Sequence, residues 1–308
     1  MGQNNHINLL AFLLVLFIGL NSFESFSQFE RVEQITTFYT RIDNPVTIEV
    51  TEHQGRFRFA AVNRSQYPYE VEIAFKVMIN LTPHITSRKY LAGPGRTHLF
   101  ELRKNIENLN YDFNYSVRTS IGNPGNIPDT LFPYLIPLKP GRAVDFVAFE
   151  MLDNVKIVSN IFASEPGEPI LNMRKGKVTA VYTSRSHTPV FFQDKISPLS
   201  SVEILHRDGT IAIYDGIDPE FLFVNTGDIV YPGQQLGLTD PEGMITVQLF
   251  QMVEGGKLQQ LNIYFAISEE QSVLFKDLFD KKIYHPAGVV KREMTRRERR
   301  LFRSGNLF

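Results

Sequence analysis

The 308-residue chain contains no cysteine and no tryptophan. The absence of cysteine excludes a disulfide framework, a thiolate metal site, a cysteine nucleophile and acylation as a lipoprotein. The formal net charge is only −1, so no overall field directs the chain towards nucleic acid or acidic lipid. The chain does contain 25 phenylalanines and 12 tyrosines, and aromatic residues favour strands. Composition therefore predicts a mainly β protein that does not bind nucleic acid.

Long apolar runs are also lacking, except near the N-terminus. Residues 9–20 form an unbroken apolar run, which is shorter than the about 20 residues that a membrane-spanning helix needs. The run has the length of the apolar segment of a signal peptide, and the small residues Ser25 and Ser27 follow it. We therefore expect a signal peptide over residues 1–28 and an exported protein of the periplasm or cell envelope, with no transmembrane span in the mature chain. The first eight residues contain no Lys or Arg, which leaves an uncleaved membrane anchor as the alternative.

Alternating apolar and polar residues predict an N-terminal β-sandwich domain over residues 29–140. The alternation is clearest in four segments: 46–50, 56–60, 70–77 and 98–102. Turn residues such as Gly93-Pro94-Gly95 separate these segments, as in sandwiches built of short strands. Four prolines between positions 128 and 140 then predict an extended connection to a second domain, because proline cannot donate to a ladder.

A second β-rich domain is predicted over residues 141–268. Its clearest strands are 177–183, 201–206, 210–214, 245–251 and 260–267, with a hairpin turn at Arg207-Asp208-Gly209. Beyond it, over residues 269–308, we expect a helix at 269–282, where apolar residues such as Val273 and Leu278 have helical spacing. The basic segment 291–303 that follows is expected to be a solvated tail, and contact with anionic lipid or wall polymers is the alternative.

Six short blocks in the second domain carry a family resemblance. They are Gly167–Ile170, Gly176–Val178, Val202–Gly209, Tyr214–Ile217, Gly227–Gly237 and Val247–Phe250. Gly227, Gly233 and Gly237 suit tight turns between short strands. The fifth block by itself also resembles biotinyl- and lipoyl-carrier folds, but the order of all six resembles the LytM or lysostaphin-type zinc metallopeptidases. The resemblance implies a LytM-like, β-barrel-type domain preceded by a β domain.

The positions at which this resemblance implies zinc binding and catalysis have lost the required chemistry. A catalytic zinc needs three protein ligands and an open position for water. The family's His-x-x-x-Asp segment falls near Ile157 and Ile161, its His-Leu-His-Phe histidines at Val247 and Leu249, and the histidine of Tyr-x-His-Leu at Gly216. None of these residues can bind zinc or transfer a proton. The resemblance therefore implies a degenerate domain with no catalytic residue, no metal ligand and no cofactor.

Two alternatives concern the same region. Zinc is the cofactor only if other residues rebuild a site, and the candidates are His187, His206, Asp194, Asp208, Asp215 and Asp218. Otherwise the former groove is an interaction surface, with five candidate residues: His206, Tyr214, Asp215, Val247 and Leu249. Strand alternation puts Val247 and Leu249 on one face, which makes that face apolar.

The sequence thus predicts an exported, non-catalytic LytM-like protein. Its expected partner is peptidoglycan or an envelope protein such as a cell-wall hydrolase, which it would regulate. One alternative is a divergent zinc metallopeptidase of the cell wall. The other is a structural or carbohydrate-binding envelope protein whose sandwich uses Tyr67, Tyr69 and Tyr90.

Overall fold

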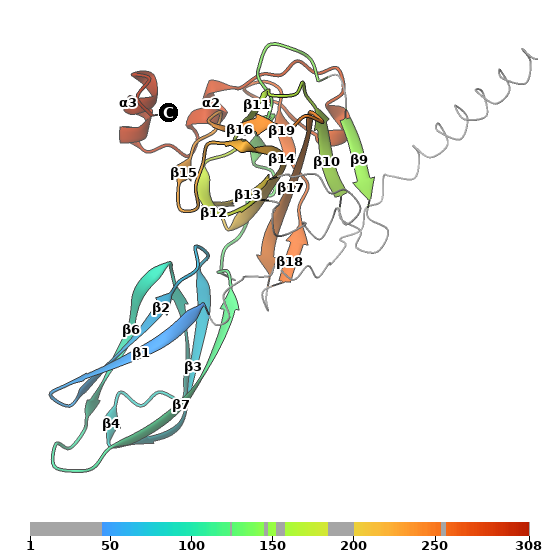
Figure 1. Cartoon of the computed structure of the whole chain (residues 1–308). Coiled ribbons are helices and arrows are strands. Elements are labelled where there is room, and N and C mark those ends of the chain that lie inside the picture. The colour runs from blue at the N-terminus through green and yellow to red at the C-terminus, as the bar shows by residue number, and fades with distance from the viewer. Residues whose placement is uncertain are drawn as a thin grey trace, which may run out of the picture. The chain divides into compact units, whose positions relative to one another are not determined.

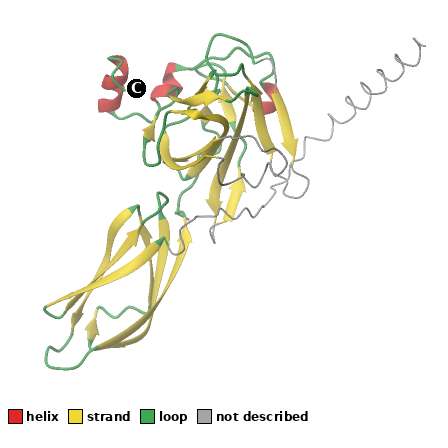
Figure 2. Cartoon of the chain, in the orientation of Figure 1, coloured by secondary structure: helices red, strands yellow, loops and turns green. Residues whose placement is uncertain are grey.

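The computed structural model describes residues 45–123, 125–144, 147–151, 158–183, 200–253 and 257–307. The described residues belong to one compact unit, and strands make up most of it (Figures 1 and 2). The expected signal peptide, residues 1–28, lies outside the described residues. Among the described residues, no helix has both the length and the apolar character needed to cross a bilayer.

Two antiparallel sheets form a sandwich in the N-terminal part of the chain, as the alternation predicts. The first has the order β1 (Val46–His53), β2 (Arg56–Asn63), β6 (Gly95–Lys104), β4 (Leu81–Thr82), and the second β5 (Ser87–Ala92), β3 (Tyr69–Ile79), β7 (Asp112–Ile121). Their inward residues share one apolar cluster, in which Phe59 stacks on Phe100 with ring centroids 4.5 Å apart. Ile211, Ile213 and Phe250 of the following sheet belong to the same cluster.

A ten-stranded sheet dominates the second part of the chain. Its main path runs β15 (Ile229–Val230), β12 (Gly176–Thr183), β13 (Ser200–His206), β14 (Thr210–Leu222), β17 (Met244–Val253), β10 (Val158–Ala163), β9 (Val147–Met151). Three further strands branch from it: β11 (Pro169–Leu171), β16 (Gln235–Thr239) and β18 (Lys257–Gln260). The path is open and the described strands form no closed barrel, so the barrel-type domain of the sequence analysis takes the form of an open, branched sheet.

The proline-rich segment contributes to the core of this second part. Within it, β8 (Pro133–Tyr134) pairs with β19 (Tyr264–Ala266), which in turn pairs with β20 (Ser272–Leu274). Tyr134 and Ile136 are at most 1 % exposed and lie in the main apolar cluster. The segment is thus extended at β8, and residues 132–138 are largely buried, whereas Ile127 and Leu131 are exposed.

The prediction of a helix at 269–282 is wrong. Residues Ser272–Leu274 form β20, and a single 3₁₀ turn, η3 (Phe275–Asp277), follows. Pairing with β19 and burial of Phe275 in the core decide this outcome, because tertiary contacts override a weak local helical pattern. The helices lie further along, at α2 (Ala287–Lys291) and α3 (Arg296–Arg303).

Candidate functional site

The ten-stranded sheet has a core face and an opposite face, and β17 shows which residues belong to each. Val247 and Leu249 are at most 2 % exposed and lie in the main apolar cluster beside Ile245. The two residues share one face, as alternation predicts. That face is the packed core, so their side chains offer no groove surface. The prediction that they line an open groove is corrected by this placement.

Tyr214 and His206 also lie on the core face. The Tyr214 hydroxyl donates to Asn172 Oδ1 at 3.0 Å and accepts the Met173 backbone N–H at 2.8 Å. The His206 ring is buried, and its Nδ1 lies 3.0 Å from the Lys175 carbonyl oxygen. Burial, together with the nearby Arg174 guanidinium, lowers the pKa of His206 to about 3. His206 is therefore a neutral core residue, and of the five predicted surface residues only Asp215 faces the other way.

The opposite face carries a buried polar cluster that the sequence analysis missed. We call it the polar face, and it consists of Ser201, Glu203, Asp215, Thr246 and Gln248, all at most 7 % exposed. The strand register brings these residues together across β13, β14 and β17. Asp215 pairs with Thr246, and Ile213 pairs with Glu203 on one side and with Gln248 on the other. Ile161 of β10 pairs with Thr246 in the same row.

Glu203 has the most strongly shifted pKa of the residues on the polar face. Its Oε2 accepts a hydrogen bond of 2.5 Å from the hydroxyl of Tyr67, which in turn accepts one of 2.9 Å from the hydroxyl of Thr179. Burial raises the pKa of Glu203 to about 7, although hydrogen bonds from Tyr67 and Tyr182 act in the opposite direction. The carboxyl therefore carries a proton in a large fraction of molecules at neutral pH.

Asp215 is the second buried carboxyl of this face. Burial raises its pKa to about 6, and a hydrogen bond donated by the Ser201 hydroxyl opposes that rise. The charge of Asp215 also contributes to the raised pKa of Glu203. Two neighbouring carboxyls with raised pKa values can hold and exchange protons near neutrality. They are enclosed, however, by hydrogen bonds within the protein.

The residues of the polar face do not fit a catalytic zinc. Thr246 and Gln248 offer a hydroxyl and an amide in place of the imidazoles that zinc prefers, and the neighbouring Ile161 supplies no donor atom. The carboxyls of Glu203 and Asp215 are bonded instead to the hydroxyls of Tyr67 and Ser201. No group of three His, Cys, Asp or Glu residues within the described ranges could hold a metal ion. Three of the candidate positions, Ile157, His187 and Asp194, lie outside the described ranges. The expectation of no cofactor stays a prediction.

Gly216 shows why a histidine is not accommodated at its position. Its φ is +93°, and a Cβ on it would lie 2.0 Å from the carbonyl oxygen of Met244. Any side chain there would overlap with the backbone of β17 and adopt a strained conformation. The position that the resemblance assigns to a catalytic histidine is therefore closed to side chains in this structure.

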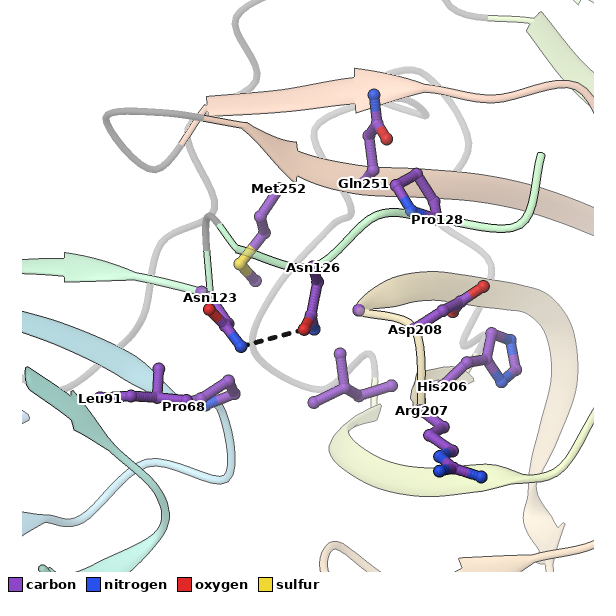
Figure 3. Close-up of a pocket in the computed structure, with 13 residues that line it drawn as sticks. Pro68, Leu91, Asn123, Asn126, Pro128, His206, Arg207, Asp208, Gln251 and Met252 are labelled. Atoms are coloured by element: carbon purple, nitrogen blue, oxygen red, sulfur yellow. Dashed lines mark hydrogen bonds between the residues drawn. The ribbon is translucent and has the colours of Figure 1, made fainter. Parts of the chain in front are cut away.

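The other acidic candidates have structural partners. Asp208 forms an ion pair of 2.8 Å with Arg174, whose guanidinium is only 2 % exposed, and Asp218 accepts the backbone N–H of Glu220 in a turn. Figure 3 shows Asp208 at a cavity of about 160 Å³ beside the hairpin turn after β13, with Asn123 donating to Asn126 nearby. Neither aspartate joins the polar face.

Solved structures similar to this chain include catalytic domains of two bacterial enzymes of the M23 or lysostaphin type. One is the catalytic domain of lysostaphin from Staphylococcus simulans, with 16% identity over 40% of this chain and 88% of that chain and a TM-score of 0.27. A variant catalytic domain of the M23 protein EnpA from Enterococcus faecalis has 19% identity, covers 42% and 92%, and scores 0.28. Csd3 from Helicobacter pylori has 12% identity, covers 70% and 68%, and scores 0.28.

No protein-family model matches the chain, and no curated protein matches it in sequence. The TM-scores of the three structures are below 0.3, so no activity passes to this chain from the likeness. The chemistry of the ten-stranded sheet is inferred from its own residues.

A signal for the missed residues is present in the sequence. Thr246 and Gln248 interrupt an otherwise apolar strand, and Glu203 does the same in β13. Isolated polar residues in buried strands require hydrogen-bond partners, which marks them as a shared polar face. Tyr67 gives no such signal, because it lies 136 residues from Glu203 in the sequence.

Proposed function

We propose that this protein is an exported, non-catalytic LytM-like protein of the cell envelope, which binds peptidoglycan or regulates an envelope partner such as a wall hydrolase. One observation carries the proposal: at the positions where the resemblance implies zinc-binding or catalytic histidines, Val247 and Leu249 are buried in the apolar core and Gly216 has no room for a side chain. A fold of this kind without its catalytic groups retains shape and surface, and these support binding.

The buried state of the polar face supports the same proposal. The Tyr67 hydroxyl donates to Glu203 and accepts from Thr179, and the Ser201 hydroxyl donates to Asp215. A hydrolase needs its acid and base within reach of the substrate, whereas these carboxyls are enclosed by the chain itself. The cluster therefore serves as a structural element in the proposed protein.

The sandwich tyrosines do not favour the carbohydrate-binding alternative. Tyr67 and Tyr69 are at most 6 % exposed and belong to the apolar cluster, and Tyr90 stacks on Phe100 with ring centroids 5.3 Å apart. Stacking on a sugar needs an accessible ring face, which the buried rings of Tyr67 and Tyr69 do not present. The partly buried ring of Tyr90 is covered by Phe100 and by the Arg88 guanidinium. Export is proposed from the apolar run at residues 9–20 and its following serines.

The test combines a catalytic and a binding measurement on the same preparation. Purified protein is incubated with peptidoglycan sacculi and added zinc between pH 5 and 8, with an active LytM-type peptidase as the positive control, and soluble muropeptides are measured by chromatography. We expect no release of soluble muropeptides. Release that a chelator abolishes would identify a divergent zinc peptidase and overturn the proposal.

The binding arm separates the two forms of the proposal. Sedimentation of the protein with sacculi would support recognition of peptidoglycan. Protein that stays in the supernatant, yet changes the rate at which a wall amidase releases peptides from the same sacculi, would support regulation of a hydrolase. Absence of both effects would count against an envelope-binding role.

A further inference from the structure

Helix α3, Arg296–Arg303, is an ordered and strongly basic element attached to the ten-stranded sheet. It begins with a capping box, in which the Thr295 side chain accepts from the Glu298 N–H and the Glu298 side chain accepts from the Thr295 N–H. Such a cap satisfies two free donors at the helix start. The basic segment expected to be a solvated tail is therefore a defined helix.

The inward face of α3 is attached by charge and by packing. Glu298 accepts hydrogen bonds from Lys175 Nζ at 2.8 Å and from the Tyr231 hydroxyl at 2.9 Å. Phe302 and Leu307 pack on the apolar cluster that includes Met294. Glu298 is the only acidic residue of α3, and its carboxylate is used on this inward side.

The outward face carries arginines and no apolar side chain. At 100° per residue, Arg296, Arg299, Arg300 and Arg303 fall within an arc of about 100°, and all four are exposed. None of the four forms an ion pair with a described residue. The strip is about 10 Å long, since each residue adds about 1.5 Å along the axis. Figure 2 shows α3 beside the strands rather than among them.

We propose that this strip, defined by Arg296, Arg299, Arg300 and Arg303, docks on a membrane surface rich in anionic phospholipid. Guanidinium groups bind phosphate in a bidentate manner, and an anionic leaflet presents phosphates in a plane that a convex helix face can contact. A soluble anionic polymer also presents phosphates, and it is therefore one outcome of the test. Because Phe302 faces inward, the contact is electrostatic and involves no insertion into the acyl region.

This inference goes beyond the proposed function and does not rest on it. The net charge of the whole chain is −1, so the strip is a local concentration of positive charge rather than part of a general field. Each basic residue near an anionic leaflet is expected to strengthen binding about fivefold. Loss of all four arginines should therefore weaken binding by roughly 500-fold or more.

The experiment is vesicle co-sedimentation with the whole chain. Vesicles of phosphatidylcholine alone are compared with vesicles that also contain phosphatidylglycerol. The readout is the anionic increment, which is the additional fraction of protein that sediments when the anionic lipid is present. Any binding through the apolar run 9–20 occurs in both vesicle types and cancels in this difference. The increment should fall steeply as salt is raised from low to high ionic strength, because screening weakens exposed charges.

Three variants make the result decisive. The combined change of Arg296, Arg299, Arg300 and Arg303 to Gln should abolish the increment, and the same positions changed to Lys should keep most of it. A matched control loses four positive charges elsewhere, through Gln at four exposed lysines: Lys257, Lys276, Lys281 and Lys282. This control should bind like the wild type. Circular dichroism checks that each variant is folded.

Three outcomes would overturn the proposal. The first is an absence of anionic increment in the wild type. The second is an equal loss in the lysine control, which would show a response to net charge alone. The third is binding to soluble polyphosphate without binding to anionic vesicles, which would assign the strip to a polymer instead of a membrane.

Discussion

Replacement of Glu203 by Gln is the sharpest test of the polar face. The Glu203 carboxyl is 3 % exposed and accepts a hydrogen bond from the Tyr67 hydroxyl. Gln has nearly the same shape, keeps an oxygen that can accept this bond, and cannot ionise. The variant therefore removes the charge of the group with little change in packing.

The expected magnitude follows from the pKa of Glu203, which burial raises from 4.5 to about 7. Each pKa unit corresponds to about 1.4 kcal/mol, so the ionised carboxyl costs the folded state roughly 3 kcal/mol. The unfolded chain loses the proton near pH 4.5, and the folded protein keeps it until about pH 7. The stabilisation from the neutral carboxyl is thus complete below pH 4.5 and is lost as the pH rises through 7.

Urea unfolding followed by circular dichroism at pH 5 and pH 8 measures this effect. The free energy of unfolding of the wild type should fall by about 2 kcal/mol more than that of Glu203→Gln over this interval. Asp215, whose pKa burial raises to about 6, contributes to the fall that remains in the variant. Glu107→Gln, at an exposed position, is the control and should follow the wild type. Parallel profiles for the wild type and Glu203→Gln would refute the assignment of a retained proton to Glu203.

Three further substitutions test the surrounding structure through the free energy of unfolding or the melting temperature. Tyr67→Phe removes a buried hydroxyl between two partners and should cost roughly 1–3 kcal/mol; a neutral result would show that this bond contributes nothing. Arg174→Ala leaves two carboxylates without their buried cation and should cost roughly 3–5 kcal/mol, whereas a change below 1 kcal/mol would contradict the burial of the pair. Gly216→Ala should lower the melting temperature much more than Gly233→Ala, because both have positive φ but only the first Cβ meets another atom; equal effects would contradict the close approach to β17.

Strand alternation and turn chemistry could be read from the sequence because they are local properties. The segments at 56–60 and 70–77 became β2 and β3, since a half-buried strand needs apolar residues at every second position. Gly227 and Gly233 have positive φ in tight turns, where glycine has no steric penalty. The LytM resemblance depended on the order of such turns.

The orientation of β17 depended on contacts that no local pattern contains. Alternation alone establishes that Val247 and Leu249 share a face, and equally that Thr246 and Gln248 share the other. Which face is the core depends on the apolar groups of β8, β12 and β19 that pack there. The same limit explains the region 269–282, where pairing with β19 outweighed helical spacing.

The sequence by itself therefore determined the β class, the turn positions and the loss of histidine at the expected zinc positions, because each is a property of residue type and spacing. Only the tertiary structure decided that Glu203 and Asp215 are buried together, that Tyr67 donates to one of them, and that α3 turns four arginines outward. These features arise from residues far apart in the chain or from the side on which an element packs. Burial and pairing of this kind are set by the whole fold, and they determine the pKa values and the exposed charge on which the proposals rest.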